Sequence, residues 1–286
     1  MKDTYTLVTD RIIAELESGT IPWHKPWTSA LPAISHTTGK VYSLLNQLLL
    51  GGRGGEYVTF QQAQKEGGRV RKGEKSSMVV FWKWLKVEDE DTGEEKDVPF
   101  LRYYNVFHID QCEGLASKFR ASEPPIITPA AANEAAEDVI HGYVSTTGVR
   151  LINRESSEAF YQPSTDTVVL PLRTQFSDTA EYYSTAFHEL IHSTGHPKRL
   201  NRITETARFG SAPYSREELC AELGASFLLN RLGLETPGSF QNNAAYISHW
   251  LGVLKEDKRL LVTAAGQADK AVRLILGEEA DHDVLA

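Results

Sequence analysis

One pentapeptide of the sequence has residue types and spacing that could do chemistry: His188-Glu189-Leu190-Ile191-His192. On an α-helix, residues four apart project from the same face, so both imidazoles can bind one zinc ion. Glu189 is placed to hold and deprotonate a metal-bound water. We therefore predict His188 and His192 as metal ligands and Glu189 as the catalytic residue, with Zn²⁺ or another divalent metal as the cofactor. The alternative is a helix that carries two surface histidines.

A catalytic zinc site needs a third protein ligand and one open position. In some metallopeptidases a histidine six residues after the second one supplies it, but that position here is Lys198. We predict Glu218 as the ligand, with Glu222, one turn later, orienting a ligand histidine. Because Ser215-x-x-Glu218 also fits a helix N-terminal capping box, Glu217 and Glu222 stay open as alternative ligands.

The elements around the motif indicate a small sheet followed by helices. Asp178 and Glu181 have capping-box spacing, and Gly195 ends the apolar stripe, so a helix should span this stretch. Short strands are expected at 149–152, 159–162 and 167–170. The strand at 159–162 could pair with an extended peptide substrate. Three nearby residues could stabilise an oxyanion, and the sequence does not select among them: Tyr214, Arg216 and His196.

The N-terminal half combines aromatic and basic residues. Single-stranded nucleic acid needs aromatic faces for its bases and cations for its phosphates. The alternative is that the tryptophans belong to a core, as most do. We predict single-stranded DNA as the partner, with double-stranded DNA as a further possibility, and a DNA-binding set of Trp23, Lys25, Trp27, Arg71, Lys72, Lys75 and Lys83.

Periodicity in this half indicates a second α+β unit. An amphipathic helix is expected over 5–16 and an apolar one over 43–50. A capping box at Thr59–Gln62 should open a short helix. Aromatic and β-branched runs at 78–85 and 100–109 read as paired strands around an acidic tip, with Trp82 and Trp84 on one face and Lys83 on the other.

Length and composition are those of two domains. The chain has 286 residues, and prolines at 124, 125 and 129 mark a boundary. We predict an N-terminal domain over 1–120, a linker over 121–133 and a second domain over 134–286, both α+β. Neither a membrane-length apolar run nor a signal peptide is expected, and the two cysteines are far apart in sequence. We therefore expect a cytoplasmic protein without a membrane partner.

The net charge of −8 describes two unlike halves. Residues 1–120 hold 16 basic and 16 acidic residues, while 121–286 hold 14 and 22 and so carry the whole excess. Six basic residues lie between Arg69 and Lys86, beside an acidic run over 88–97. Because the field at a surface depends on local charge, an acidic total does not exclude DNA binding.

Taken together, these segments resemble the ArdC family of plasmid antirestriction proteins, whose N-terminal domain also occurs on TraC-type primases. The resemblance spans nearly the whole chain, in order. The second half also resembles, more distantly, the ImmA/IrrE metallopeptidases, although Gly224 replaces their usual aromatic residue. The stretches that carry the ArdC resemblance are Ile21-Pro22-Trp23 with Pro26-Trp27, Tyr42 with Asn46–Leu50, Thr59–Ala63, Gly68–Lys75, Val80–Lys83, Tyr103–Phe107, His188–His196 and Tyr214–Glu222.

The resemblance implies an N-terminal domain that binds single-stranded DNA and a zincin-like metallopeptidase domain. It also implies a role in protecting conjugative DNA from host restriction, with a protein of the restriction system as a candidate substrate. Two alternatives stay open. In one, DNA binding alone protects and the metal site is structural or vestigial. In the other, the acidic surface mimics DNA and inhibits restriction enzymes, although −8 is too modest a charge to favour this.

Overall fold

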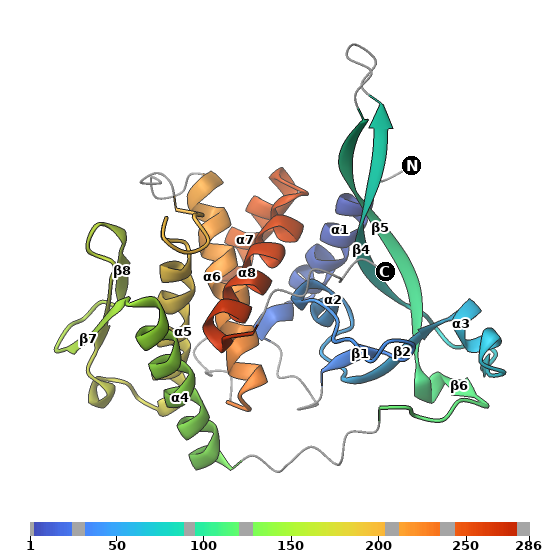
Figure 1. Cartoon of the computed structure of the whole chain (residues 1–286). Coiled ribbons are helices and arrows are strands. Elements are labelled where there is room, and N and C mark those ends of the chain that lie inside the picture. Colours follow the sequence, from blue (N-terminus) through green and yellow to red (C-terminus); the bar gives the residue numbers. More distant parts are fainter. Residues whose placement is uncertain are drawn as a thin grey trace.

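The computed structural model describes residues 3–24, 32–88, 95–119, 128–203, 212–234 and 244–278. Helices and sheets are mixed in both halves, as the sequence predicts (Figure 1). A long β-hairpin projects from the N-terminal half, and the C-terminal half is a small sheet with a layer of helices. Within the described residues, no helix is long and apolar enough to cross a membrane.

The N-terminal half is built on a four-stranded sheet of order β1-β2-β5-β4. Its hairpin strands pair antiparallel without interruption from Ser77↔Val106 to Glu88↔Glu95. Thr59 and Gln62 form the predicted capping box at the start of α3. The elements are α1 (Thr4–Glu17), a 3₁₀ turn (Pro22–His24), β1 (Ala33–Ser35), α2 (Leu44–Leu49), β2 (Gly55–Thr59), α3 (Phe60–Lys65), β3 (Arg69–Val70), β4 (Ser77–Glu88), β5 (Glu95–His108) and β6 (Cys112–Glu113).

The C-terminal half starts with a helix and a three-stranded sheet of order β7-β9-β8, so β8 is an edge strand. The central strand β9, between β7 and β8, is buried along its whole length. The elements are α4 (Pro129–Thr147), β7 (Arg150–Arg154), β8 (Phe160–Gln162), β9 (Thr167–Pro171), α5 (Thr179–Thr194), α6 (Ala212–Arg231), α7 (Ala244–Glu256) and α8 (Leu260–Leu276).

Two element boundaries differ from the sequence prediction. Helix α4 begins at Pro129, so 129–133 of the predicted linker are helical; the Thr128 hydroxyl caps the helix and Pro129 is favoured at its first position. The rest of the linker lies outside the described residues, apart from Thr128. Helix α6 begins at Ala212, so Ser215 lies inside the helix and is not its N-cap.

The two halves share one hydrophobic core. Helix α1 packs against α7 and α8, and α2 packs against α8 (Figure 1). Polar contacts join the same helices: Asp269 of α8 accepts the backbone N–H of Leu44 at 2.9 Å and so caps α2. The Thr9 hydroxyl donates to the carbonyl of Lys258 at 2.7 Å. The N-terminal helices are therefore part of the packing that supports the C-terminal ones.

Candidate metal centre

Local signals in the sequence form the helix that carries the His-Glu-x-x-His motif. The side chain of Asp178 accepts the backbone N–H of Glu181 at the start of α5, and Gly195 follows its last turn. Phe187, Leu190 and Ile191 are fully buried beneath the motif. Because the apolar stripe fixes the rotation of the helix, His188 and His192 face the neighbouring helix α6.

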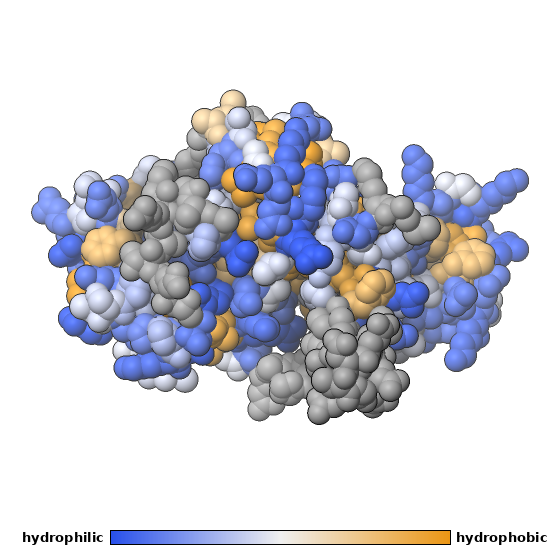
Figure 2. Space-filling model, turned by 90° about the horizontal axis from the view of Figure 1, so that it is seen from above, coloured by the Kyte–Doolittle hydropathy of each residue, from blue (hydrophilic) through white to orange (hydrophobic). Residues whose placement is uncertain are grey.

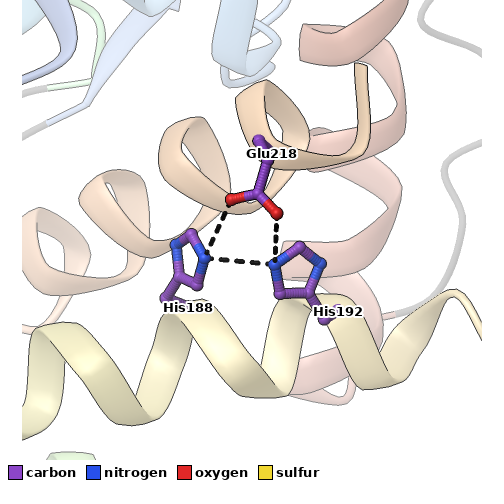
Figure 3. A group of neighbouring side chains, drawn as sticks. All are labelled: His188, His192 and Glu218. Carbon is purple, nitrogen blue, oxygen red and sulfur yellow. Dashed lines mark hydrogen bonds and ion pairs between the residues drawn. The ribbon is translucent and has the colours of Figure 1, made fainter. Parts of the chain in front are cut away.

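Helix α6 approaches α5 closely because residue 224 is a glycine. A Cβ atom at Gly224 would lie 2.6 Å from Cδ1 of Ile191, closer than real side chains pack. An aromatic residue there would push the helices apart. The close approach brings Glu218, a turn and a half earlier on α6, opposite the two histidines (Figure 3).

The three predicted ligand side chains lie together, with one donor atom from each within 4.8 Å of the others. The two Nε2 atoms of His188 and His192 are 3.1 Å apart. Glu218 places one carboxylate oxygen 3.6 Å from Nε2 of His188 and the other 3.7 Å from Nε2 of His192. Ligands of a tetrahedral zinc ion, about 2.1 Å from the metal, lie about 3.4 Å from one another. The donor set therefore fits a divalent metal such as zinc.

Glu217 holds one of these histidines in place. Its carboxylate lies 3.1 Å from Nδ1 of His192, and Arg202 donates to both oxygens of Glu217 at 2.8 and 2.9 Å. A hydrogen bond from Nδ1–H to this carboxylate leaves the Nε2 lone pair of His192 free for a metal. Burial would raise the pKa of Glu217, but the hydrogen bonds from His192 and Arg202 outweigh it and hold that pKa below its usual value.

Glu222, for which the sequence predicts this orienting role, has other partners in the structure, which corrects that prediction. Glu222 accepts a hydrogen bond from the Tyr246 hydroxyl and lies 3.3 Å from Nε2 of His24. It is one turn further along α6 than Glu218, so it faces the 3₁₀ turn of the N-terminal half. The sequence could not show this, because the contacts depend on His24 and Tyr246, which are distant in the chain.

His188, His192 and Glu218 line a cleft of about 1170 Å³. Glu189 is buried among the cleft-lining residues, beside both histidines. Edge strand β8 forms part of one wall, and Tyr214 and Arg216 of α6 form part of the other. Hydrogen bonds from His188 and Tyr214 hold the pKa of Glu218 below its usual value although burial opposes this, and burial together with Glu218 raises the pKa of Tyr214.

Both halves match known protein families. A family model described as the N-terminal domain of anti-restriction factor ArdC matches residues 2–107, and one described as a zincin-like metallopeptidase matches residues 137–267. The crystal structure of the metal-free antirestriction protein ArdC from plasmid R388 is 36% identical. It superposes with a TM-score of 0.75 over 98% of this chain and 100% of the other.

The chain belongs to the ArdC antirestriction family.

Other relatives extend the comparison. The Mn(II)-bound structure of R388 ArdC is 35% identical, with a TM-score of 0.74 over 99% of this chain and 100% of that chain. The uncharacterized protein y4eC of Sinorhizobium fredii is 32% identical over 98% of this chain and 93% of its own length. A DNA primase TraC of Escherichia coli is 34% identical over 97% of this chain. The ArdC-type chain spans only about a quarter of that primase, 27% of its length.

The predicted DNA-binding residues do not form one cluster in this ArdC-family structure. Trp23 is buried: its indole N–H donates to Tyr246 at 3.1 Å and its ring packs edge-on against Trp250. It is therefore a core residue and no stacking surface, which corrects the prediction. Lys25 and Trp27 lie outside the described residues.

The remaining predicted DNA contacts occupy two separate surfaces. Arg71, Lys72 and Lys75 belong to an exposed turn, where Arg71 is paired with Glu74 at 2.9 Å. Lys83 is exposed on β4 and lines a groove that Trp23, Arg71, Lys72 and Lys75, the other predicted contacts among the described residues, do not line. These cations are predicted as one group because they are close in the sequence. In the folded chain, Lys83 lies on the sheet and the others lie on the turn.

Proposed function

We propose that the chain is a bifunctional antirestriction protein. Its N-terminal half, over 1–120, binds single-stranded DNA, and its C-terminal half, from 134, is a zinc-dependent metallopeptidase. Glu189 is the catalytic residue, and His188, His192 and Glu218 hold the metal. The substrate is a protein of the restriction system in the recipient cell, so that incoming conjugative DNA survives.

The proposed peptidase activity rests on one observation: His188, His192 and Glu218 lie in the wall of a large cleft. A structural zinc site has four protein ligands and is closed. Among the described residues, three donors meet here, and all three line a cleft that Glu189 also lines. Two nitrogens and a carboxylate oxygen are the ligand set of His₂Glu zinc peptidases.

The arrangement supports peptide hydrolysis in a definite way. When bound, a divalent metal would polarise the scissile carbonyl and lower the pKa of a water molecule. Glu189 would accept the proton of the attacking water and pass it to the leaving nitrogen. The edge strand β8 would hold an extended substrate by strand pairing, and the Tyr214 hydroxyl, which donates to Glu218 in this structure, would have to turn from that carboxylate to donate to the developing oxyanion.

The test is Glu189→Gln, which keeps the size of the side chain and removes the base. We expect the full-length variant to bind one zinc ion per chain as the wild type does, measured by elemental analysis of purified protein. Cleavage of restriction-enzyme subunits, followed on gels, should fall by about 10²–10⁴-fold. His192→Ala is the matched control and should lose both metal and cleavage.

A conjugation assay into a restricting recipient distinguishes the alternative function, protection by DNA binding alone, from the bifunctional proposal. If Glu189→Gln still protects unmodified plasmid DNA as well as the wild type, protection comes from DNA binding alone and the metal site is structural or vestigial. Loss of protection with retained zinc supports the bifunctional proposal.

A further inference from the structure

A groove of about 900 Å³ lies on the N-terminal half, away from the metal centre. Aromatic side chains gather in it without being buried: Phe60 is 49% exposed and Tyr104 is 40% exposed. Phe81 also lines the groove, and its ring centroid lies 6.0 Å from that of the buried Tyr42 and 5.7 Å from that of Tyr104. The exposed ring of Tyr104 therefore packs against Phe81, which in turn packs against the buried ring of Tyr42.

The register of the hairpin extends this surface along one face. In antiparallel strands, paired residues point to the same side. The pairs Val79↔Tyr104, Phe81↔Arg102 and Lys83↔Phe100 follow one another along β4 and β5. Phe100 is 48% exposed, and Arg102 and Lys83 are exposed. Aromatic rings and cations thus alternate over about 13 Å, four residues of strand.

The charge of the groove is one-sided. Lys40, Lys65 and Lys83 line it, and no acidic side chain does so within the described part of the chain. Two exposed amide side chains, Gln61 and Asn105, also line it and can hydrogen-bond to base edges. Seen from above, apolar residues lie among strongly hydrophilic ones at the end of the molecule that holds α3 (Figure 2).

We propose that this groove is the binding site for single-stranded nucleic acid, with Phe60, Phe81, Tyr104 and Phe100 stacking bases and Lys40, Lys65, Lys83 and Arg102 neutralising phosphates. A duplex does not fit this chemistry, because its bases are already stacked on one another. An acidic protein surface would satisfy the cations but would not use the exposed ring faces. The inference rests on the proposed DNA-binding function and gives it a location that differs from the basic turn at 71–75.

The test compares neighbouring residues on opposite faces of β5 in the full-length protein. Tyr104→Ala removes a ring of the groove, and Tyr103→Ala removes an equally exposed ring from the other face. The probe is a fluorescein-labelled oligothymidylate of about 20 nucleotides, longer than one such site needs. We expect Tyr104→Ala, and independently Phe60→Ala, to weaken binding by about 5- to 100-fold. Tyr103→Ala should bind as the wild type does.

Charge variants give a second measurement that does not depend on the aromatic rings. Replacing Lys65 and Lys83 with serine should lower the slope of log affinity against log salt by about 0.7 for each lysine. The same replacement of Lys72 and Lys75, in the basic turn, should leave the slope nearly unchanged. All four lysines are exposed, so the variants should fold, and equal circular dichroism spectra would verify this.

The outcomes separate this site from the function on which it rests. Loss of binding in the Lys72 and Lys75 variant with no loss in Tyr104→Ala would overturn the groove and leave DNA binding standing. Equal affinity for a blunt duplex would also overturn it, while tight binding of an oligouridylate would support base stacking. A wild-type protein that binds no nucleic acid would overturn the proposed DNA-binding function itself.

Discussion

At the scale of single residues, the glutamates of α6 have three different surroundings. Glu218 faces both histidines, Glu217 contacts Nδ1 of His192 and the guanidinium of Arg202, and Glu222 contacts Tyr246 and His24. Helical spacing predicts that residues four apart share a face, which singles out Glu218 and Glu222. It does not predict which neighbour each one meets, because Arg202 and Tyr246 come from other elements.

The contact between Glu217 and His192 should matter for metal affinity. Glu217→Gln keeps a hydrogen-bond acceptor but removes the negative charge beside Nδ1 of His192. We expect zinc affinity, measured by competition with a chromophoric chelator, to fall by about 10- to 100-fold. Glu222→Gln is the matched control, since the hydrogen bond and the ion pair of Glu222 go to Tyr246 and His24, whereas Glu217 contacts His192 directly. An equal loss in both variants would contradict the orienting role of Glu217.

At the scale of elements, some boundaries of helices and strands are set by local sequence signals and others by tertiary contacts. Adjacent residues are enough to predict the N-cap at Asp178, the helix end at Gly195 and the capping box at Thr59. Helices α5 and α3 therefore begin and end close to where the sequence predicts. The start of α6 is three residues before Ser215, because a Ser-x-x-Glu pattern inside a helix looks the same as a capping box. The short strands β1 and β2 escape prediction, since β2 forms by pairing with the distant β5 and β1 by pairing with β2.

One carboxylate fastens the segment after β5 to the N-terminal sheet. Glu56 of β2 is buried and accepts the backbone N–H groups of Lys118 and Phe119 at 3.1 and 3.0 Å, besides the Ser117 hydroxyl. It also contacts Nδ1 of the buried His36 at 2.5 Å. Burial would raise the pKa of Glu56, but these hydrogen bonds lower it to about 2.

This pKa predicts an acid-dependent contribution to stability. A carboxylate whose pKa is lower in the folded state stabilises the fold above its unfolded value of 4.5, and the contribution disappears as pH falls toward 2. Glu56→Gln should therefore lower the free energy of unfolding by about 2–3 kcal/mol at pH 7. The difference from the wild type, measured by urea unfolding, should shrink between pH 5 and 3. A difference that does not change with pH would rule out this role.

At the scale of the whole molecule, the halves that two family models describe separately are packed as one body. Trp23 shows why the sequence alone misplaces some residues. From the sequence, a tryptophan near Lys25 and a second tryptophan is a reasonable DNA contact. In the structure, however, Tyr246 and Trp250, more than 200 residues away in the chain, pack against Trp23 and bury it. The candidate metal ligands His188 and His192 are predictable because they are four residues apart, whereas the groove proposed for DNA depends on the register of the hairpin and on the elements that pack beside it.

The shared core predicts that the N-terminal half does not fold stably alone. Val8, Ile12, Leu44 and Leu48 are at most 3% exposed and belong to the cluster that contains α7 and α8. Exposing four such side chains costs roughly 6–12 kcal/mol, as much as the whole stability of a typical domain. A fragment of residues 1–119 should therefore bind a hydrophobic dye and melt without a sharp transition. The full chain should instead melt in one transition. Ile12→Ala, on α1, should lower the midpoint of this transition and the temperature of metal release together, because α1 packs against α7 and α8 and so supports both halves. A fragment that melts sharply and binds no dye would show that the shared core is not required.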